Sequence, residues 1–110
     1  MLNINQKIAV MRVLLDIIYA DGRVDNRETS LFDDLLSKLD LPLESKEQIQ
    51  RKSSLIALLD IKNFTKEQKA YFADLMDKMI KVDEDININE VAIYDVVIDY
   101  CNIPIPFVSD

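Results

Sequence analysis

The chain contains no histidine and no tryptophan, and it has only one glycine and one cysteine among its 110 residues. Without histidine there is no imidazole to activate a serine or cysteine nucleophile or to ligate zinc. Gly22 alone cannot build a glycine-rich phosphate loop. The single Cys101 cannot form an internal disulfide, so we expect a reducing compartment and a cytoplasmic protein. These absences exclude most catalytic arrangements, and we expect that the protein is not an enzyme.

Positive charge and long apolar runs are also scarce. Lysine and arginine total 13 against 20 aspartate and glutamate residues, which gives a net charge of −7 at pH 7. Phosphate-backbone binding needs clustered basic side chains, so we expect no nucleic-acid partner, whereas cations and basic partners fit this charge. No basic region leads into an apolar run near the N-terminus, so no signal peptide is predicted. Arg12 and Asp16 interrupt the apolar stretch that begins at Ile8, well short of the roughly 18 residues of a membrane span.

The rest of the sequence places apolar residues at helical spacing. An apolar content of 49% fits a single domain, residues 1–110, that closes one core. We expect an all-α, compact bundle of five or more helices, in which the first helix is central because more than one of its faces is apolar. Ser53-Ser54 leaves open whether residues 44–60 form one helix or two. The residues expected to face inward are Ile4, Ile8, Val10, Met11, Leu14, Leu15, Ile17 and Ile18, then Leu31, Leu35, Leu36 and Leu39, then Ile49, Ile56 and Leu59, then Phe72, Leu75, Met76, Met79 and Ile80, and finally Ile93, Val97 and Cys101.

The two halves of the chain repeat each other at a constant offset of 62 residues (83 − 21). Identical pairs at this offset are Gln6/Gln68, Lys7/Lys69, Ile18/Ile80, Asp21/Asp83, Glu28/Glu90, Asp33/Asp95 and Pro42/Pro104. We therefore predict two duplicated helical hairpins, repeat one at 3–42 and repeat two at 65–104. A helical segment at 43–64 connects them, and a tail follows at 105–110. Related hairpins tend to pack with pseudo-two-fold symmetry, so we expect the first helix of each repeat to pack against the other.

An acidic loop joins the two helices of each repeat. The later residues of each loop fit the start of a helix, since an N-cap side chain followed three residues on by glutamate is a capping box. These residues are Asp25 and Glu28 in the first loop and Asn87 and Glu90 in the second. Helix capping therefore explains four polar positions without any ligand.

Asp21 and Asp83 are not explained in this way. Each lies where a helix ends, and there the helix macrodipole disfavours negative charge by roughly 0.3 to 1 kcal/mol. The N-terminus of the following helix, a basic side chain or a divalent cation would each offset that cost. The sequence leaves these three compensators open.

The residues around these loops resemble a known family. The stretch Ala20-Asp21-Gly22-Arg23-Val24, followed by Glu28 and by a leucine-rich helix that ends at Leu41-Pro42, resembles the tellurite-resistance TerB family. It is also similar to the amino-terminal domain of a membrane-anchored DnaJ-type co-chaperone. The second repeat, from Asp83 to Pro104, resembles the second half of the same family. The resemblance covers the chain from about Gln6 to Pro104.

This resemblance implies an all-helical bundle, a cytoplasmic bacterial setting, a link to metal or oxyanion stress, and loop residues that hold a divalent metal. By position, the implied metal residues are Asp21, Asp25 and Glu28 in the first loop and Asp83, Asn87 and Glu90 in the second. Two positions depart from the family pattern, because Glu84 replaces a glycine and Asn87 replaces an acid. Asp85 adds a carboxylate in a stretch that begins like an EF-hand, although Ile88 and Tyr94 occupy the positions where an EF-hand has glycine and glutamate. The expected cofactor is a calcium-like or magnesium-like cation.

We therefore expect a non-enzymatic TerB-like stress-response module that binds a divalent cation, a protein partner or both through its acidic loop face. The alternative is a metal-free helical scaffold that self-associates or docks to another protein. For that role the chain offers the tail, Ile105 to Phe107, or an apolar face of the last helix. Cys101 and the methionines Met11, Met76 and Met79 lie at core spacing, and we expect them to serve packing.

Overall fold

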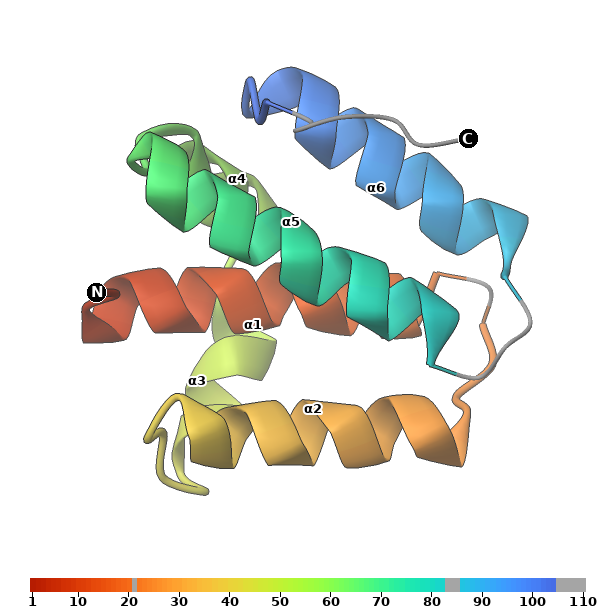
Figure 1. Cartoon of the computed structure of the whole chain (residues 1–110). Coiled ribbons are helices and arrows are strands. Elements are labelled where there is room, and N and C mark those ends of the chain that lie inside the picture. The colour runs from red at the N-terminus through yellow and green to blue at the C-terminus, as the bar shows by residue number, and fades with distance from the viewer. Residues whose placement is uncertain (21, 83–85, 105–110) are drawn as a thin grey trace.

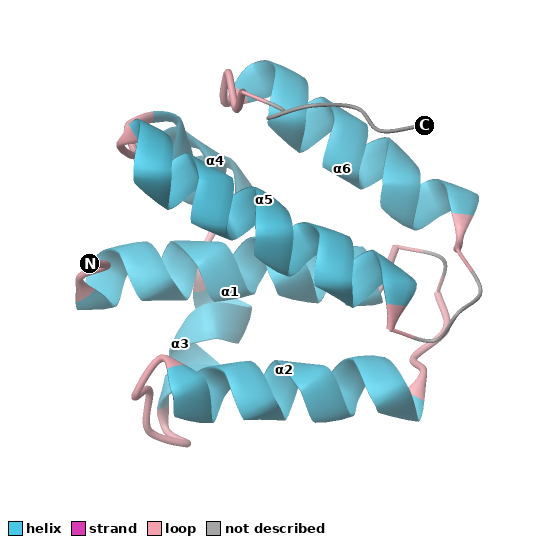
Figure 2. Cartoon of the chain, in the orientation of Figure 1, coloured by secondary structure: helices cyan, strands magenta, loops and turns pink. Residues whose placement is uncertain are grey.

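The computed structural model describes residues 1–20, 22–82 and 86–104, and over these it contains helices and loops only (Figure 2). The six helices are α1 (Ile4–Ile18), α2 (Asn26–Lys38), α3 (Ser45–Arg51), α4 (Ser54–Lys62), α5 (Lys66–Lys81) and α6 (Ile88–Tyr100). The radius of gyration is 13.0 Å, which is the value of a compact globule of this length. The predicted all-α fold is confirmed. Asp21, Asp83 and Asp85 and the tail from Ile105 lie outside the described residues.

Helices α1 and α5 begin with the predicted capping boxes. At α1 the backbone N–H of Gln6 donates to the Asn3 side chain at 2.8 Å, and the Asn3 N–H donates back to the Gln6 side chain at 2.9 Å. At α5 the same two bonds join Thr65 and Gln68, at 3.1 and 2.9 Å. Each box satisfies two backbone groups that would otherwise lack a partner in the first turn.

The ends of α2 and α6 are also alike. Asp40 and Asn102 follow these helices with φ values of 57° and 53°, a left-handed conformation that ends helices and that Asn and Asp tolerate better than most residues. Beyond them the Leu41 N–H donates to the Leu36 carbonyl at 2.9 Å, and the Ile103 N–H donates to the Ile98 carbonyl at 3.0 Å. These bonds satisfy carbonyls that the helix itself leaves open.

The connecting segment forms two helices, which settles the alternative that the sequence left open. Ser53 has an extended backbone, φ −66° and ψ 132°, and its hydroxyl accepts the N–H of Ile56. Serine competes for backbone hydrogen bonds in this way and therefore favours a cap over a helix interior. The chain turns between α3 and α4 at this point.

Helix α1 is the centre of the bundle, as predicted. It contacts each of the other five helices, and Figure 1 shows it crossing the middle of the molecule between α2 and the upper helices. Its residues Ala9, Val10, Met11, Leu14 and Ile17 have no exposed surface. Helices α1 and α5 do contact each other, although α1 packs most extensively against α4.

Some residues expected in the core lie on the surface. Ile4 is 58% exposed, Ile56 is 48% exposed and Leu59 is 45% exposed. In α4 the buried residues are instead Ala57 and Ile61. Apolar residues surround α4 on every side, so periodicity could not select the face that packs against α1.

Candidate functional site

The described parts of both acidic loops lie at one end of the bundle. There α1 and α5 end, and α2 and α6 begin (Figure 1). We call this the acidic loop end, comprising residues 22–28 and 86–90. Gly22 has φ +78°, and that left-handed conformation is open to glycine without a steric penalty.

Asp25 is the N-cap of α2, as predicted. Its Oδ1 accepts the backbone N–H of Arg27 at 2.7 Å and the Arg27 Nε at 3.2 Å, and Oδ2 accepts a terminal guanidinium nitrogen at 3.3 Å. The side-chain bond from Arg27 is the main reason that the pKa of Asp25 is lowered from its ordinary value. Asp25 is therefore a charged carboxylate already engaged by its own helix.

Asn87 occupies the equivalent place at α6. Its side-chain oxygen accepts the N–H of Asn89 at 2.8 Å and that of Glu90 at 3.3 Å. An N-cap amide supplies these acceptor bonds as well as a carboxylate does, at no cost in charge. Capping thus gives Asn87 a role that needs no ligand.

Glu28 and Glu90 were expected to complete the capping boxes of α2 and α6, and that role stays a prediction. Their burial was not predicted: each residue is buried, with 2% of its surface exposed. Both occupy the third position of their helix, directly after an acidic loop. Both α2 and α6 contact α1 and α5, and we attribute the burial of the two glutamates to this packing. Sequence spacing alone did not distinguish an inward glutamate from a surface one.

The predicted metal set stays a prediction. Asp21, Asp83 and Asp85 lie outside the described residues. Among the residues that are described, no three Asp, Glu, His or Cys side chains come together in a way that would hold a metal ion. The described residues of the acidic loop end include two buried glutamates, Glu28 and Glu90, and two helix N-caps, Asp25 and Asn87.

A larger hollow lies on a different face, between α1, α4 and α6, and it includes apolar residues of the last helix. We call it the α1–α4–α6 groove. Its volume is about 580 Å³, and its apolar walls include Val13, Leu58, Ile93 and Val96. Both α4 and α6 are apolar on nearly all sides, which is typical of helices that are fully covered. Here they are not covered, since Leu55 is 73% exposed and Val96 is 60% exposed.

Arg12 and Asp16 are the charged residues of this groove, and they form part of a network that ties three helices together. The Arg12 guanidinium donates to Asp16 Oδ1 at 2.9 Å, to the Ser54 hydroxyl at 3.2 Å and to the Gln50 carbonyl at 2.8 Å. The Ser54 hydroxyl in turn donates to Asp16 Oδ2 at 2.8 Å. These side chains hold the turn between α3 and α4 against α1.

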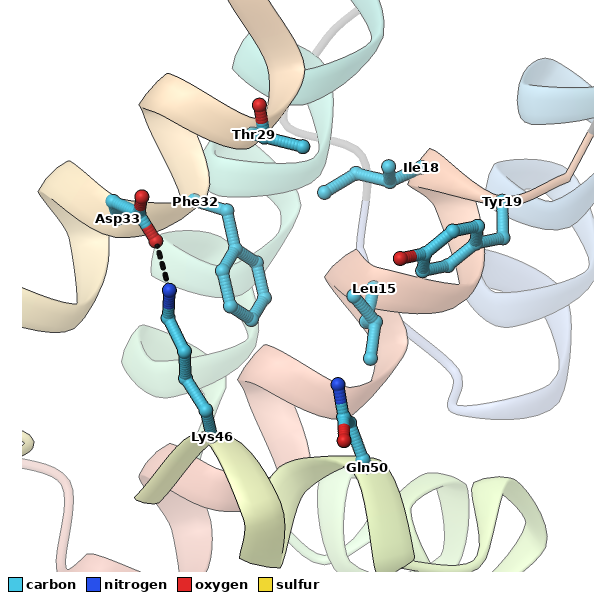
Figure 3. A pocket seen from close by; sticks show the side chains of 8 residues that line it. All are labelled: Leu15, Ile18, Tyr19, Thr29, Phe32, Asp33, Lys46 and Gln50. Atoms are coloured by element: carbon cyan, nitrogen blue, oxygen red, sulfur yellow. Dashed lines mark ion pairs between the residues drawn. The ribbon is translucent and has the colours of Figure 1, made fainter. Parts of the chain in front are cut away.

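A smaller hollow of about 150 Å³ lies between α1, α2 and α3. Figure 3 shows Phe32 pointing into it beside the ion pair of Lys46 and Asp33, whose nitrogen and oxygen are 2.9 Å apart. Its volume is about half the lower limit of roughly 300 Å³ for small-molecule sites. Tyr19 lines both this hollow and the α1–α4–α6 groove.

The sulfur-containing residues serve packing. Met11, Met76, Met79 and Cys101 have no exposed surface. The Cys101 thiol lies 3.5 Å from the Leu58 carbonyl, and burial raises the pKa of this thiol. A buried thiol with a raised pKa is a poor nucleophile, so Cys101 is a core residue, as expected.

Comparisons with known proteins identify the fold. A crystal structure of a protein of unknown function from Porphyromonas gingivalis W83 superposes with a TM-score of 0.75 at 18% sequence identity, covering 96% of this chain and 89% of that one. No protein-family model and no curated protein matches the sequence. Within the described residues, no helix combines the length and the apolar content that crossing a bilayer requires. The similarity shows a shared fold.

Proposed function

We propose that this protein is a non-enzymatic, TerB-like stress-response module that binds a divalent cation, a protein partner or both at its acidic loop end. The observation that carries the proposal is the pair of buried glutamates, Glu28 and Glu90, at equivalent positions after the two acidic loops. Buried carboxylates are rare because removing them from water is costly. A hard cation prefers carboxylate oxygens and would offset negative charge at this end of the bundle.

The duplication of the chain supports the same proposal. Described features recur at the offset of 62 residues: capping boxes at Asn3 and Thr65, N-caps at Asp25 and Asn87, buried glutamates at Glu28 and Glu90, and left-handed residues at Asp40 and Asn102. We interpret them as two related hairpins that each present an acidic loop. The candidate ligands are Asp21, Asp25 and Glu28 from the first and Asp83, Asp85, Asn87 and Glu90 from the second.

A specific observation favours a second candidate function. Helices α4 and α6 expose large apolar side chains, among them Leu55 and Val96. Such a surface is typical of a scaffold that docks to another protein or to its own copy. In that case the acidic loops are capped turns, and the apolar face of α4 and α6 binds the other protein or the second copy.

Thermal unfolding of the full chain tests the cation proposal. The protein is melted with a chelator and then with millimolar calcium, magnesium or manganese, as the parent and as Asp21→Asn. A ligand that binds only the folded state at 100 times its dissociation constant adds about 2.7 kcal/mol of stability, or roughly 10 °C for a domain of this size. We expect such a rise for the parent and its loss in Asp21→Asn.

Asp34→Asn is the matched control. It removes the same charge from the exposed surface of α2 and should keep the cation-dependent rise. If none of the three ions raises the melting temperature of the parent, the cation proposal is refuted and the loops are structural turns. A higher melting temperature for Asp21→Asn in chelator alone would show that the Asp21 charge is unfavourable at the end of α1.

A further inference from the structure

The α1–α4–α6 groove is separate from the acidic loop end, and its own chemistry indicates what it binds. Along α6 its edge is formed by Ala92, Val96 and the neighbouring Ile93. On α4, Leu58 lies in the groove and Leu55, one turn earlier, stands exposed beside it. Residues 92 and 96 lie one helical turn apart, and the apolar edge continues to Tyr100 one turn later, a length of about 12 Å. This edge fits two turns of another helix.

The polar groups of the groove are already occupied. Arg12 uses its donors on Asp16, Ser54 and the carbonyl of Gln50. Small-molecule sites need a few polar groups that converge on the ligand and orient it. This groove offers instead an apolar surface, and an apolar surface between helices is the setting in which proteins accept the apolar face of an amphipathic helix.

The charges around the groove indicate which helix or segment could cover it. Helix α6 carries exposed Asp95 and Asp99 and no basic residue, and the whole chain has a net charge of −7. A basic group at the end of this edge is Lys62 of α4, whose Nζ lies 4.7 Å from the centre of the Tyr100 ring. A second copy would place two such acidic helices together. The tail, residues 105–110, has no basic residue and ends in Asp110, so it lacks the complementary charge as well. A partner with Lys or Arg beside its apolar stripe is the complement.

We propose that the α1–α4–α6 groove binds an amphipathic helix of a partner protein whose apolar stripe is flanked by basic residues. Its apolar side chains pack on Val96 and Leu58, and its basic side chains face Asp95 and Asp99 of α6. This inference rests on the second candidate function above, docking to another protein, and it is independent of the cation proposal.

A synthetic helix is the probe. An 18-residue peptide, about 27 Å long as a helix, is long enough to cover the edge of about 12 Å. It carries leucine at positions i, i+3, i+4 and i+7 with lysine on both sides of the stripe, and its fluorescence anisotropy is measured with the full chain. Two comparison peptides carry the same residues in scrambled order, or glutamate in place of lysine. We expect binding of the patterned lysine peptide and at least tenfold weaker binding of either comparison.

Variants of the full chain locate the binding. Val96→Gln removes an apolar side chain from the groove without adding charge, and it should weaken binding of the peptide about tenfold. Ile88→Gln is the matched control, because Ile88 is also an exposed apolar residue of α6, 80% exposed against 60% for Val96, and it does not line the groove. Asp99→Lys should also weaken binding severalfold, and the control Asp34→Lys should not. Circular dichroism checks that each variant keeps its helices.

Several outcomes would overturn the proposal. Equal binding of patterned and scrambled peptides, or equal effects of Val96→Gln and Ile88→Gln, would show that the groove is not the site. Sedimentation equilibrium that finds a dimer of the parent, abolished by Val96→Gln, would make a second copy the occupant. A gain in peptide affinity of tenfold or more on Phe107→Asp would make the tail the occupant. The melting shift with cations is measured on the same variants, so failure here is distinguishable from failure of the cation proposal.

Discussion

Replacement of Arg12 by methionine tests whether its network supports the fold. Methionine keeps an unbranched apolar stem and removes only the guanidinium, so packing along α1 changes little. The guanidinium donates to Asp16, Ser54 and Gln50, and both Arg12 and Asp16 are largely buried, with 22% and 25% of their side chains exposed. The replacement leaves the part-buried carboxylate of Asp16 and the part-buried hydroxyl of Ser54 without this donor.

The magnitude follows from those contacts. Hydrogen bonds that involve a charged group contribute about 1.5 to 3 kcal/mol each when buried, and an exposed i,i+4 pair contributes only about 0.3 to 0.5 kcal/mol. Arg12 is partly screened, so we take the lower limit for the part-buried bond to Ser54 and a surface value for the pair with Asp16. With about 0.5 kcal/mol for the exposed bond to the Gln50 carbonyl, we expect Arg12→Met to lower the free energy of unfolding by about 2 to 3 kcal/mol.

Urea unfolding followed by far-ultraviolet circular dichroism measures this change, since the chain has no tryptophan to report by fluorescence. Arg51→Met is the matched control, because Arg51 forms an i,i+4 pair with Glu47 in which both side chains are about two-thirds or more exposed. Arg51→Met should lower the free energy of unfolding by less than about 0.5 kcal/mol. Arg12→Lys should recover less than half of the loss, because an ammonium lacks the planar fork that reaches three acceptors. The reasoning is refuted if Arg12→Met costs no more than Arg51→Met.

Substitution of Gly22 tests the backbone, and chemical labelling of Cys101 tests the core. Gly22→Ala should lower the free energy of unfolding by about 1 kcal/mol, because its φ of +78° disfavours alanine although an added Cβ would meet no atom within 4 Å. Gly22→Asn should lower the free energy of unfolding by less. Equal melting temperatures for the glycine and alanine forms would contradict this expectation. Cys101 should resist a thiol reagent at pH 8 in the folded protein and react once urea unfolds it, because burial raises its pKa. The raised pKa means that folding favours the neutral thiol. Its contribution to stability is therefore complete below the ordinary thiol pKa and is lost as the pH rises through the raised pKa of the folded protein. Rapid labelling of Cys101 in the native protein would contradict a buried thiol.

Local signals in the sequence predicted most of the helices. Asn3 and Thr65 with their glutamines, and Asp25 and Asn87 after the loops, act within a single turn, so their hydrogen bonds depend little on the rest of the chain. The inward rows of α1, α2 and α5 were likewise readable because each of these helices has a distinct polar face. Here local propensity and the tertiary fold agree.

The buried face of α4 was not readable in that way, whereas the predicted row of α6 is confirmed at Val97 and Cys101. Helix α4 is apolar nearly all round, so the sequence could not choose between Ile56 or Leu59 and Ala57 as the residue in the core. Contact with α1 makes that choice. It also leaves Leu58 of α4 and Ile93 and Val96 of α6 as walls of a groove beside α1. Of this groove the sequence indicated only an apolar face of the last helix.

The sequence by itself determined where most of the helices start and stop, because capping and chain reversal depend on neighbouring residues; the break between α3 and α4 was left to the structure. It also marked the acidic loops and their repetition at a constant offset. Only the tertiary structure decided that Glu28 and Glu90 are buried, and that Arg12 and Asp16 join Ser54 across three helices. Those placements depend on which helix packs over which, and burial of a side chain is a property of the assembled bundle that no local pattern contains.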